Sequence, residues 1–202
     1  YNDPVSITGN DFLTSVEWRA GNGLIFNLKY KNENKEDTRA TYDEFGREVK
    51  QIDNRNQMNV RFGFIYQMTK NFRFRSRFEY VYIDYKDFNA DYKGTLFYSD
   101  MRFIPLNRLT FDIRYIVFDT DNYDSRIYEF ENDIAGVMSN VPLYGKGRRV
   151  YLVMNYKPFP FFAISAKYAE TYLDGIKTIG SGNDLINNDI NNRLSVGINL
   201  LF

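Results

Sequence analysis

The last residues of the chain alternate between apolar and polar side chains. Leu194, Val196, Ile198, Leu200 and Phe202 fall on one side of an extended segment, and most residues between them are polar. A period of two is typical of a β-strand with one apolar face. The ends of soluble domains usually fray, so a regular strand that runs to a final aromatic residue indicates a chain built around a sheet.

The same period recurs along the chain, whereas helical periodicity is hard to find. Alternating segments cover residues 12–19, 24–31, 58–68, 72–82, 95–104, 109–117, 128–134, 150–156 and 162–168. The connections between these segments alternate between short turns and longer polar stretches. The short turns are 20–23, 69–71, 105–108 and 157–160, and the longer connections are 32–55, 87–93, 119–125 and 174–188. This alternation of connections is typical of outer-membrane β-barrels, which have short periplasmic turns and longer external loops.

Composition favours a barrel in a membrane and excludes several chemistries. Aromatic residues make up 18% of the 202 residues, yet the mean hydropathy of −0.49 is polar, as in strands with one lipid-facing and one polar side. No run of about 18 apolar residues predicts a membrane helix. The 26 basic and 26 acidic residues balance, and His and Cys are absent. Disulfides, thiolate metal sites and the commonest general base are thereby removed, and we expect no enzymatic activity.

These observations predict an all-β fold, an antiparallel transmembrane β-barrel of about 10–12 strands in the bacterial outer membrane. The alternative is a soluble β-barrel or sandwich that binds an apolar ligand inside. The membrane interpretation requires a defined set of large apolar side chains to face lipid. They are Phe62, Phe64, Phe78, Tyr80, Phe111, Leu152, Ile164, Ile198 and Leu200.

The direction of the strands bears on domain organisation. Residues 128–134 and 150–156 would both run inward, so the segment 135–144 is expected to be a return strand, ending in a tight turn at 145–147. The count then reaches about 11 strands, whereas closed single-chain barrels usually have an even number. We therefore expect residues 1–202 to form one barrel domain that is truncated at its N-terminus, the C-terminal part of a larger barrel.

Charged residues that alternate with the apolar ones are the main candidate site. They form a predicted ladder inside the barrel: Arg61, Arg73, Arg75, Arg77, Glu79, Asp112, Arg114, Glu129, Glu131 and Asp133. The arginines could attract anions or a phosphate backbone, or they could form an internal salt-bridge network with these acids and Glu17. Glu129, Glu131 and Asp133 could bind Ca²⁺, but alternate acids on one strand offer only one edge of such a site, so we expect no metal and no cofactor.

The residues from Ser195 to Phe202 resemble the C-terminal strand that the assembly machinery of outer-membrane barrels recognises. Ser195, Gly197, Leu200 and Phe202 occupy the characteristic positions of that pattern. The resemblance implies that the barrel-assembly machinery is a partner through this strand. It also implies that membrane lipid surrounds the barrel.

The segments 127–134, 143–152 and 179–186 resemble the C-terminal barrel of a family of outer-membrane proteins of Bacteroidota. Members of that family often carry a helix-hairpin-helix segment upstream, and such segments usually bind DNA. The resemblance implies a pore, an uptake or export conduit, or a membrane anchor for an upstream domain. DNA would then be a partner only through a domain absent from this chain.

Overall fold

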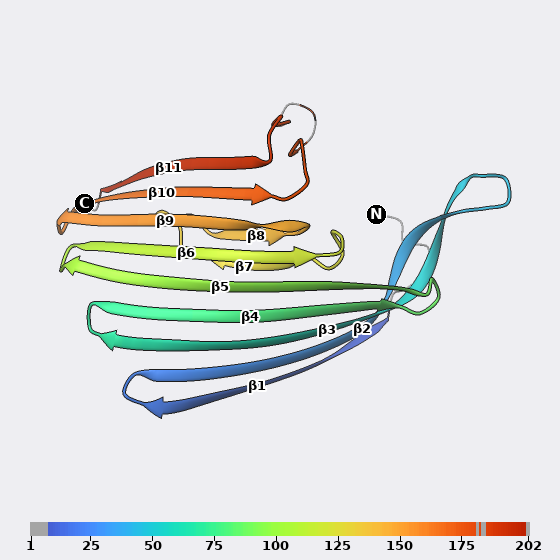
Figure 1. Ribbon diagram of the computed structural model, residues 1–202, viewed down its shortest axis with the longest axis horizontal. Helices are drawn as coiled ribbons and strands as arrows, with labels where there is room; N and C mark the ends of the chain where they lie inside the picture. Colours follow the sequence, from blue (N-terminus) through green and yellow to red (C-terminus); the bar gives the residue numbers. More distant parts are fainter. Residues whose placement is uncertain (1–7, 181, 183–184, 201–202) are drawn as a thin grey trace.

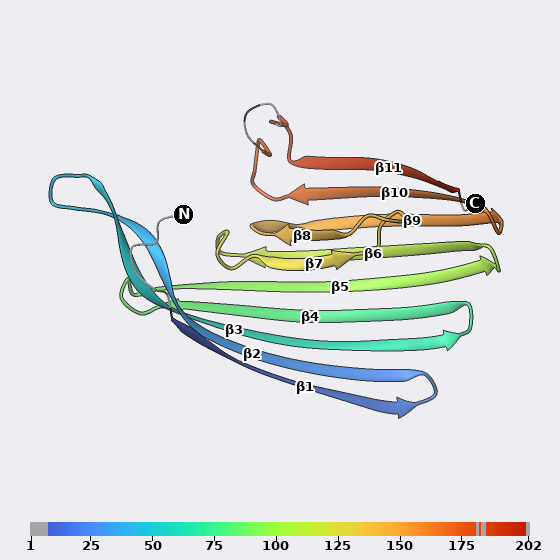
Figure 2. The same ribbon diagram turned by 180° about the vertical axis from the view of Figure 1, so that it is seen from behind.

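The structure is a computed structural model that describes residues 8–180, 182 and 185–200, and it consists almost entirely of antiparallel strands (Figures 1 and 2). The strands are β1 (Gly9–Gly21), β2 (Leu24–Tyr42), β3 (Glu48–Thr69), β4 (Phe72–Tyr85), β5 (Ala90–Leu106), β6 (Leu109–Thr120), β7 (Ile127–Glu131), β8 (Ser139–Leu143), β9 (Lys146–Phe159), β10 (Phe162–Leu173) and β11 (Ile190–Leu200). No helix long and apolar enough to cross a membrane occurs among the described residues.

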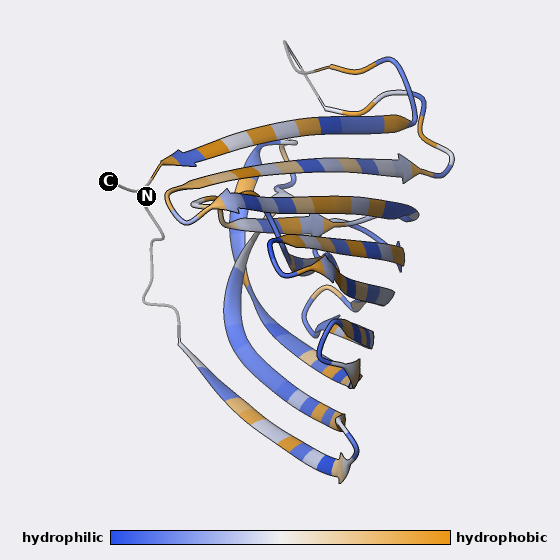
Figure 3. Ribbon diagram, turned by 90° about the vertical axis from the view of Figure 1, so that its left-hand side faces the viewer, coloured by the Kyte–Doolittle hydropathy of each residue, from blue (hydrophilic) through white to orange (hydrophobic). Residues whose placement is uncertain are grey.

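Nine of the strands form one sheet in the order β1-β2-β3-β4-β5-β6-β9-β10-β11, and every neighbouring pair is antiparallel. The sheet is curved, and its edge strands β1 and β11 lie far apart in the described part of the chain (Figures 1 and 3). The short turns between strands lie at one end, which is also where β11 ends (Figure 1). The predicted all-β antiparallel architecture is confirmed.

The polar segment 32–55 is mostly strand, which corrects the prediction of a long loop there. β2 and β3 stay paired from Leu24↔Tyr66 out to Tyr42↔Glu48, and this hairpin projects beyond the other strands (Figure 1). Backbone pairing needs no apolar face. Where both faces of a hairpin meet water, the alternating pattern that reveals a strand in the sequence is lost.

Strands β7 and β8 are not part of the sheet, which corrects the assignment of residues 128–134 and 135–144 to the barrel wall. They pair only with each other in the described structure, and β6 pairs directly with β9. The described residues therefore form eleven strands, of which nine make up the wall. The β7–β8 hairpin instead packs against one face of the sheet, which we call the inner face. Ile127, Glu129 and Glu131 of β7 are buried there.

The opposite, outer face of the sheet is apolar and uncovered. Its alternating hydropathy is visible along the strands in Figure 3. Cross-strand pairing joins large side chains into a continuous row: Val16, Leu28, Phe62, Phe78, Phe97 and Val117. Among the nine residues expected to face lipid, five are exposed (Phe62, Phe78, Leu152, Ile198 and Leu200), and Phe64, Tyr80, Phe111 and Ile164 are half-buried. None of the nine is buried, as the membrane interpretation requires.

The inner face carries an apolar core that the sequence pattern does not predict. The core lies near the end with the longer connections, between the sheet and the β7–β8 hairpin. Its buried members are Val81, Ile83, Tyr85, Leu96, Tyr98, Ile116, Phe118, Ile127 and Leu143. The alternating pattern predicts a polar lining on this side of the sheet. The lining is apolar here because the β7–β8 hairpin packs on it.

Candidate functional site: a charged network on the inner face

The predicted charged ladder gathers on the inner face because strand periodicity places alternate residues on one side. Arg73, Arg75, Arg77 and Glu79 succeed one another on β4. Pairing with the neighbouring strands brings opposite charges together: Arg61↔Glu79 from β3, Arg75↔Asp100 from β5, and then Arg102↔Asp112 and Asp100↔Arg114 between β5 and β6.

Arg114 is the centre of this network and is 1% exposed. Its Nη2 donates to Asp100 Oδ2 at 2.9 Å, and its Nη1 donates to Glu129 Oε2 at 3.2 Å and to the Phe130 carbonyl at 2.9 Å. The guanidinium also lies 4.2 Å from the centre of the Tyr98 ring. A buried charge is costly unless it is paired and hydrogen-bonded, and Arg114 meets both conditions.

The β7–β8 hairpin is held to the wall by its carboxylates. Glu129 contacts Arg77 and Arg114, so β7 is joined to both β4 and β6. Glu131 accepts hydrogen bonds from Arg149 Nε at 2.6 Å and from Lys167 Nζ at 2.9 Å. These contacts explain why the acidic side of β7 faces the sheet instead of solvent.

The segments that flank β7 lie close to two glycines of the wall. A Cβ at Gly94 would lie 2.4 Å from the Ser125 carbonyl oxygen, just before β7. A Cβ at Gly197 would lie 3.4 Å from Ile134 Cδ1, just after β7, and 3.1 Å from Ser165 Oγ. Asp133, close to Ile134, pairs with Lys167 at 2.8 Å. Small residues in the wall therefore let the hairpin segment approach the sheet closely.

Two further pairs lie toward the sides of the network. Arg61 donates to both carboxylate oxygens of Glu79, at 2.8 and 3.0 Å. Arg102 donates to both oxygens of Asp112, at 2.6 and 3.0 Å. Such two-point contacts are the strongest form of the arginine–carboxylate pair.

The salt-bridge arrangement therefore describes most of the predicted ladder. Of the ten predicted residues, Arg73 alone has no ion pair among the described residues. Glu17, expected to join the network, instead contacts Arg19 at 2.9 Å on exposed β1. Asp100, Arg102, Arg149 and Lys167 also belong to the network. Asp100 and Arg102 alternate with Met101 and Phe103 in the predicted strand 95–104, so a signal for them was present.

The three acids considered for calcium all face cations. Glu129 meets Arg77 and Arg114, and Glu131 and Asp133 share Lys167. The described residues contain no group of three or more acidic, His or Cys side chains arranged to hold a metal ion.

Two cavities lie beside the hairpin, one on either side, between it and neighbouring strands of the inner face. One, of about 220 Å³, is lined by Lys29, Lys31, Gln57, Asn59, Arg61, Glu79, Arg126, Ile127 and Tyr128. The other, of about 380 Å³, lies over β9, β10 and β11 and includes Arg149, Lys167, Arg193 and Ser195. The smaller cavity is lined largely by polar and charged side chains, and the larger one has a mixed lining that also includes Ile134, Val137, Met138, Val141 and Ala169. The charged side chains in both make the space beside the hairpin suited to water and ions.

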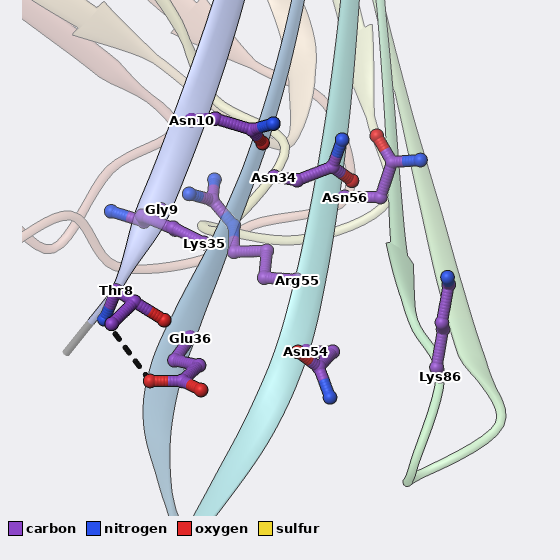
Figure 4. Close-up of a pocket in the computed structure, with 10 residues that line it drawn as sticks. All are labelled: Thr8, Gly9, Asn10, Asn34, Lys35, Glu36, Asn54, Arg55, Asn56 and Lys86. Carbon is purple, nitrogen blue, oxygen red and sulfur yellow. Dashed lines mark hydrogen bonds between the residues drawn. The ribbon is translucent and has the colours of Figure 1, made fainter.

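A third cavity, of about 500 Å³, lies where β1, β2 and β3 leave the apolar row (Figure 4). Its lining includes the amides Asn10, Asn34, Asn54 and Asn56 and the cations Lys35, Arg55 and Lys86. The Thr8 backbone N–H donates to Glu36 at 3.0 Å on its floor, the dashed line in Figure 4. The wall of the sheet is thus polar beyond the apolar row.

The residues of the predicted assembly signal occupy both faces of β11. Ser195 lines the 380 Å³ cavity and Gly197 approaches Ile134 on the inner face. Leu200 pairs with Phe162 and is 54% exposed on the outer face. Phe202 lies outside the described residues, and recognition by the assembly machinery stays a prediction.

Comparison with solved structures shows the fold. OmpT, an outer membrane protein of Vibrio cholerae, is 10% identical over 95% of this chain and 55% of its own, with a TM-score of 0.59. The anion-selective porin from Comamonas acidovorans is 9% identical over 94% of this chain and 59% of its own, with a TM-score of 0.52. The NanC porin is 12% identical over 96% of this chain and 94% of its own, with a TM-score of 0.44.

The chain thus spans 55% and 59% of the first two of these structures. No protein-family model and no curated protein matches it. The predicted outer-membrane β-barrel fold is confirmed, and the predicted localisation in the bacterial outer membrane agrees with it. The relation to Bacteroidota proteins with a helix-hairpin-helix segment stays a prediction.

Proposed function

We propose that this chain forms the wall of a non-enzymatic outer-membrane pore for small hydrophilic solutes. The observation that carries the proposal is the separation of the two faces of one sheet. The outer face is an uncovered apolar row, and the inner face holds a charged network and a folded-in hairpin. Lipid suits the first surface and water the second.

The inner hairpin favours the interpretation of the pore as a narrow conduit and not as a wide channel. β7 and β8 occupy space beside β4, β5 and β6, and Arg114, Glu129 and Glu131 hold the hairpin there with almost no exposure. The cavities of about 220 and 380 Å³ on its two sides are the spaces left for solutes. We expect small ions to pass more readily than large solutes.

Non-enzymatic transport also agrees with the chemistry of the side chains. The chain contains no His and no Cys. The buried carboxylates of the network are engaged with arginine or lysine, and a paired carboxylate is poorly suited to act as a general acid or base. We propose no cofactor.

Planar-bilayer recording tests the pore. The purified protein should produce discrete conductance steps, and replacing residues 127–143 with a short flexible linker should enlarge them. The matched control shortens the β2–β3 hairpin at residues 43–47, which lie beyond the other strands, and should leave the steps unchanged. A correctly folded protein that produces no steps in either form would refute the pore.

Two other roles remain distinct from this one. A membrane anchor for an upstream, DNA-binding domain would be favoured by a folded barrel without conductance. A soluble barrel or sandwich would need its apolar face covered, whereas Phe62, Phe78 and Ile198 are 46%, 44% and 64% exposed. Solubility without detergent would favour that soluble alternative. The expected partners are lipid along the outer face and the assembly machinery at β11.

A further inference from the structure

Arg73 differs from every other charged residue of the inner-face ladder. It is the second residue of β4, next to the short turn at Lys70–Asn71, and it is half-buried on the inner face. No side-chain hydrogen bond or ion pair joins it to any described residue, and its Nε, like those of Arg75 and Arg77, is buried without an acceptor. A guanidinium carries five N–H donors, so Arg73 is a cation whose donors are unused.

The residues nearest Arg73 in the sheet are mostly basic, and the two acids near it, Asp100 and Asp112, form their hydrogen bonds with other arginines. Arg102 stands directly opposite in the β4–β5 register, and Arg75 follows on the same face of β4. Asp112 accepts hydrogen bonds from Nε and Nη2 of Arg102, and Asp100 is shared by Arg75 and Arg114. Like charges directly opposite each other destabilise a sheet. The Arg73–Arg102 pair is therefore unfavourable, and the charge of Arg73 has no ion-pair partner in the described part of the chain.

The imbalance extends through this half of the network. Six guanidinium groups, Arg61, Arg73, Arg75, Arg77, Arg102 and Arg114, face four carboxylates, Glu79, Asp100, Asp112 and Glu129. An anion at Arg73 would satisfy its unused donors and offset the repulsion from Arg102 at the same time.

We propose that Arg73 and Arg102 form a binding site for a compact oxyanion, a carboxylate or phosphate group, on the inner face near the short turns. The planar guanidinium fork matches two oxygens of such a group. The site faces the inside of the sheet and not the lipid-facing row, so its ligand is a solute. Its role in selecting anions rests on the proposed pore, whereas binding itself does not.

Phosphate binding to the purified protein in a phosphate-free detergent tests the site at constant ionic strength. Titration calorimetry and the unfolding temperature are measured for the parent protein, Arg73→Gln and Lys70→Gln. Lys70 is a matched control, because it lies in the adjacent exposed turn and its removal changes the net charge equally. We expect Arg73→Gln to weaken phosphate binding about tenfold or more, and Lys70→Gln to leave it unchanged.

The unfolding temperature without phosphate separates a site from a structural role. Arg73→Gln relieves the repulsion with Arg102, so its basal unfolding temperature should match or exceed that of the parent protein, and phosphate should no longer raise it. Equal phosphate binding by the parent protein and Arg73→Gln, or an equal loss in both variants, would overturn the site. Conductance steps that persist while phosphate binding is absent would overturn the site and leave the pore intact.

Discussion

Placing an arginine at Phe78 tests which surface of the sheet faces lipid. Phe78 lies on the outer face, pairs with Phe62 and Phe97, and is 44% exposed, so a longer side chain fits without a clash. It lies six residues after Phe72, the first residue of β4. At about 3.3 Å per residue that is about 20 Å along the strand, or about 15 Å along the membrane normal at a tilt of about 40°.

An apolar band about 25 Å tall has its midplane about 12 Å from either interface, so Phe78 lies close to the centre of the membrane. Arginine at this depth should cost about 2–4 kcal/mol relative to alanine, whereas at Phe72, near the interface, it should cost about 0–1 kcal/mol. Comparing Arg with Ala at each position removes the packing that both substitutions lose.

The assay is reversible urea unfolding of the protein refolded from denaturant into phospholipid vesicles. The single tryptophan, Trp18, is a fluorescence probe on the outer face, 63% exposed. The reasoning is refuted if the Arg-minus-Ala difference at Phe78 is no larger than at Phe72. It is also refuted if Phe78→Arg is as stable as the parent protein in vesicles.

Three other changes probe separate parts of the fold. Gly94→Ala places a Cβ 2.4 Å from the Ser125 carbonyl oxygen and should cost about 1–3 kcal/mol while increasing proteolysis around β7, measured by urea unfolding and limited digestion. Deleting Phe202 should reduce the amount of protein in the outer membrane, measured by fractionation, and equal yields would contradict the assembly signal. The Asp43 carboxylate accepts hydrogen bonds from the backbone N–H groups of Arg47 and Phe45 and contacts the Arg47 guanidinium, which lowers the pKa of Asp43 below its ordinary 3.8. Its contribution to the hairpin tip is present above the unfolded pKa and is lost as the pH falls through the lower folded pKa. The hydrogen-exchange protection factors of the tip amides, which are corrected for the intrinsic exchange rate at each pH, should therefore fall only in acid, and Asp43→Asn should remove that dependence.

The sequence predicts the fold best where one face of a strand lies in apolar surroundings and the other face lies in polar surroundings. β4 is the clearest case, since Phe78 and Tyr80 alternate with Arg77 and Glu79 and the structure places them on opposite faces. Beyond the apolar row, β2 and β3 continue with polar residues on both faces, and periodicity gives no signal there. Their pairing extends to Tyr42↔Glu48 all the same.

The β7–β8 hairpin shows the other limit of the sequence pattern. Residues 127–131 alternate as a wall strand would, because Ile127, Glu129 and Glu131 pack on one surface and Tyr128 and Phe130 point away from it. Periodicity reports that a strand has two different faces, but not which surface each face meets. The pairing partner decides that point, and partners between distant residues are not encoded in a local period.

The charged site follows the same division. Alternation predicts that Arg75, Arg114 and Glu129 share a face, but the pairs they form depend on register and on the folded-in hairpin. That Arg73 has no ion pair among the described residues could not be predicted in this way. Whether a charged residue lacks an ion-pair partner depends on the pairs that all of its neighbours form, and those pairs are set by the folded structure.

The number of strands in the sheet limits how a barrel can close. Nine antiparallel strands leave β1 and β11 running in the same direction, and each has one paired neighbour in the described chain. Closing β1 directly on β11 would create a single parallel pair in an otherwise antiparallel wall. Unpaired backbone groups in hydrocarbon cost several kcal/mol each, so an open edge is a poor alternative. An odd number of additional strands would restore antiparallel pairing and give the even total that single-chain barrels usually have, which is why we continue to expect these residues to be part of a larger barrel.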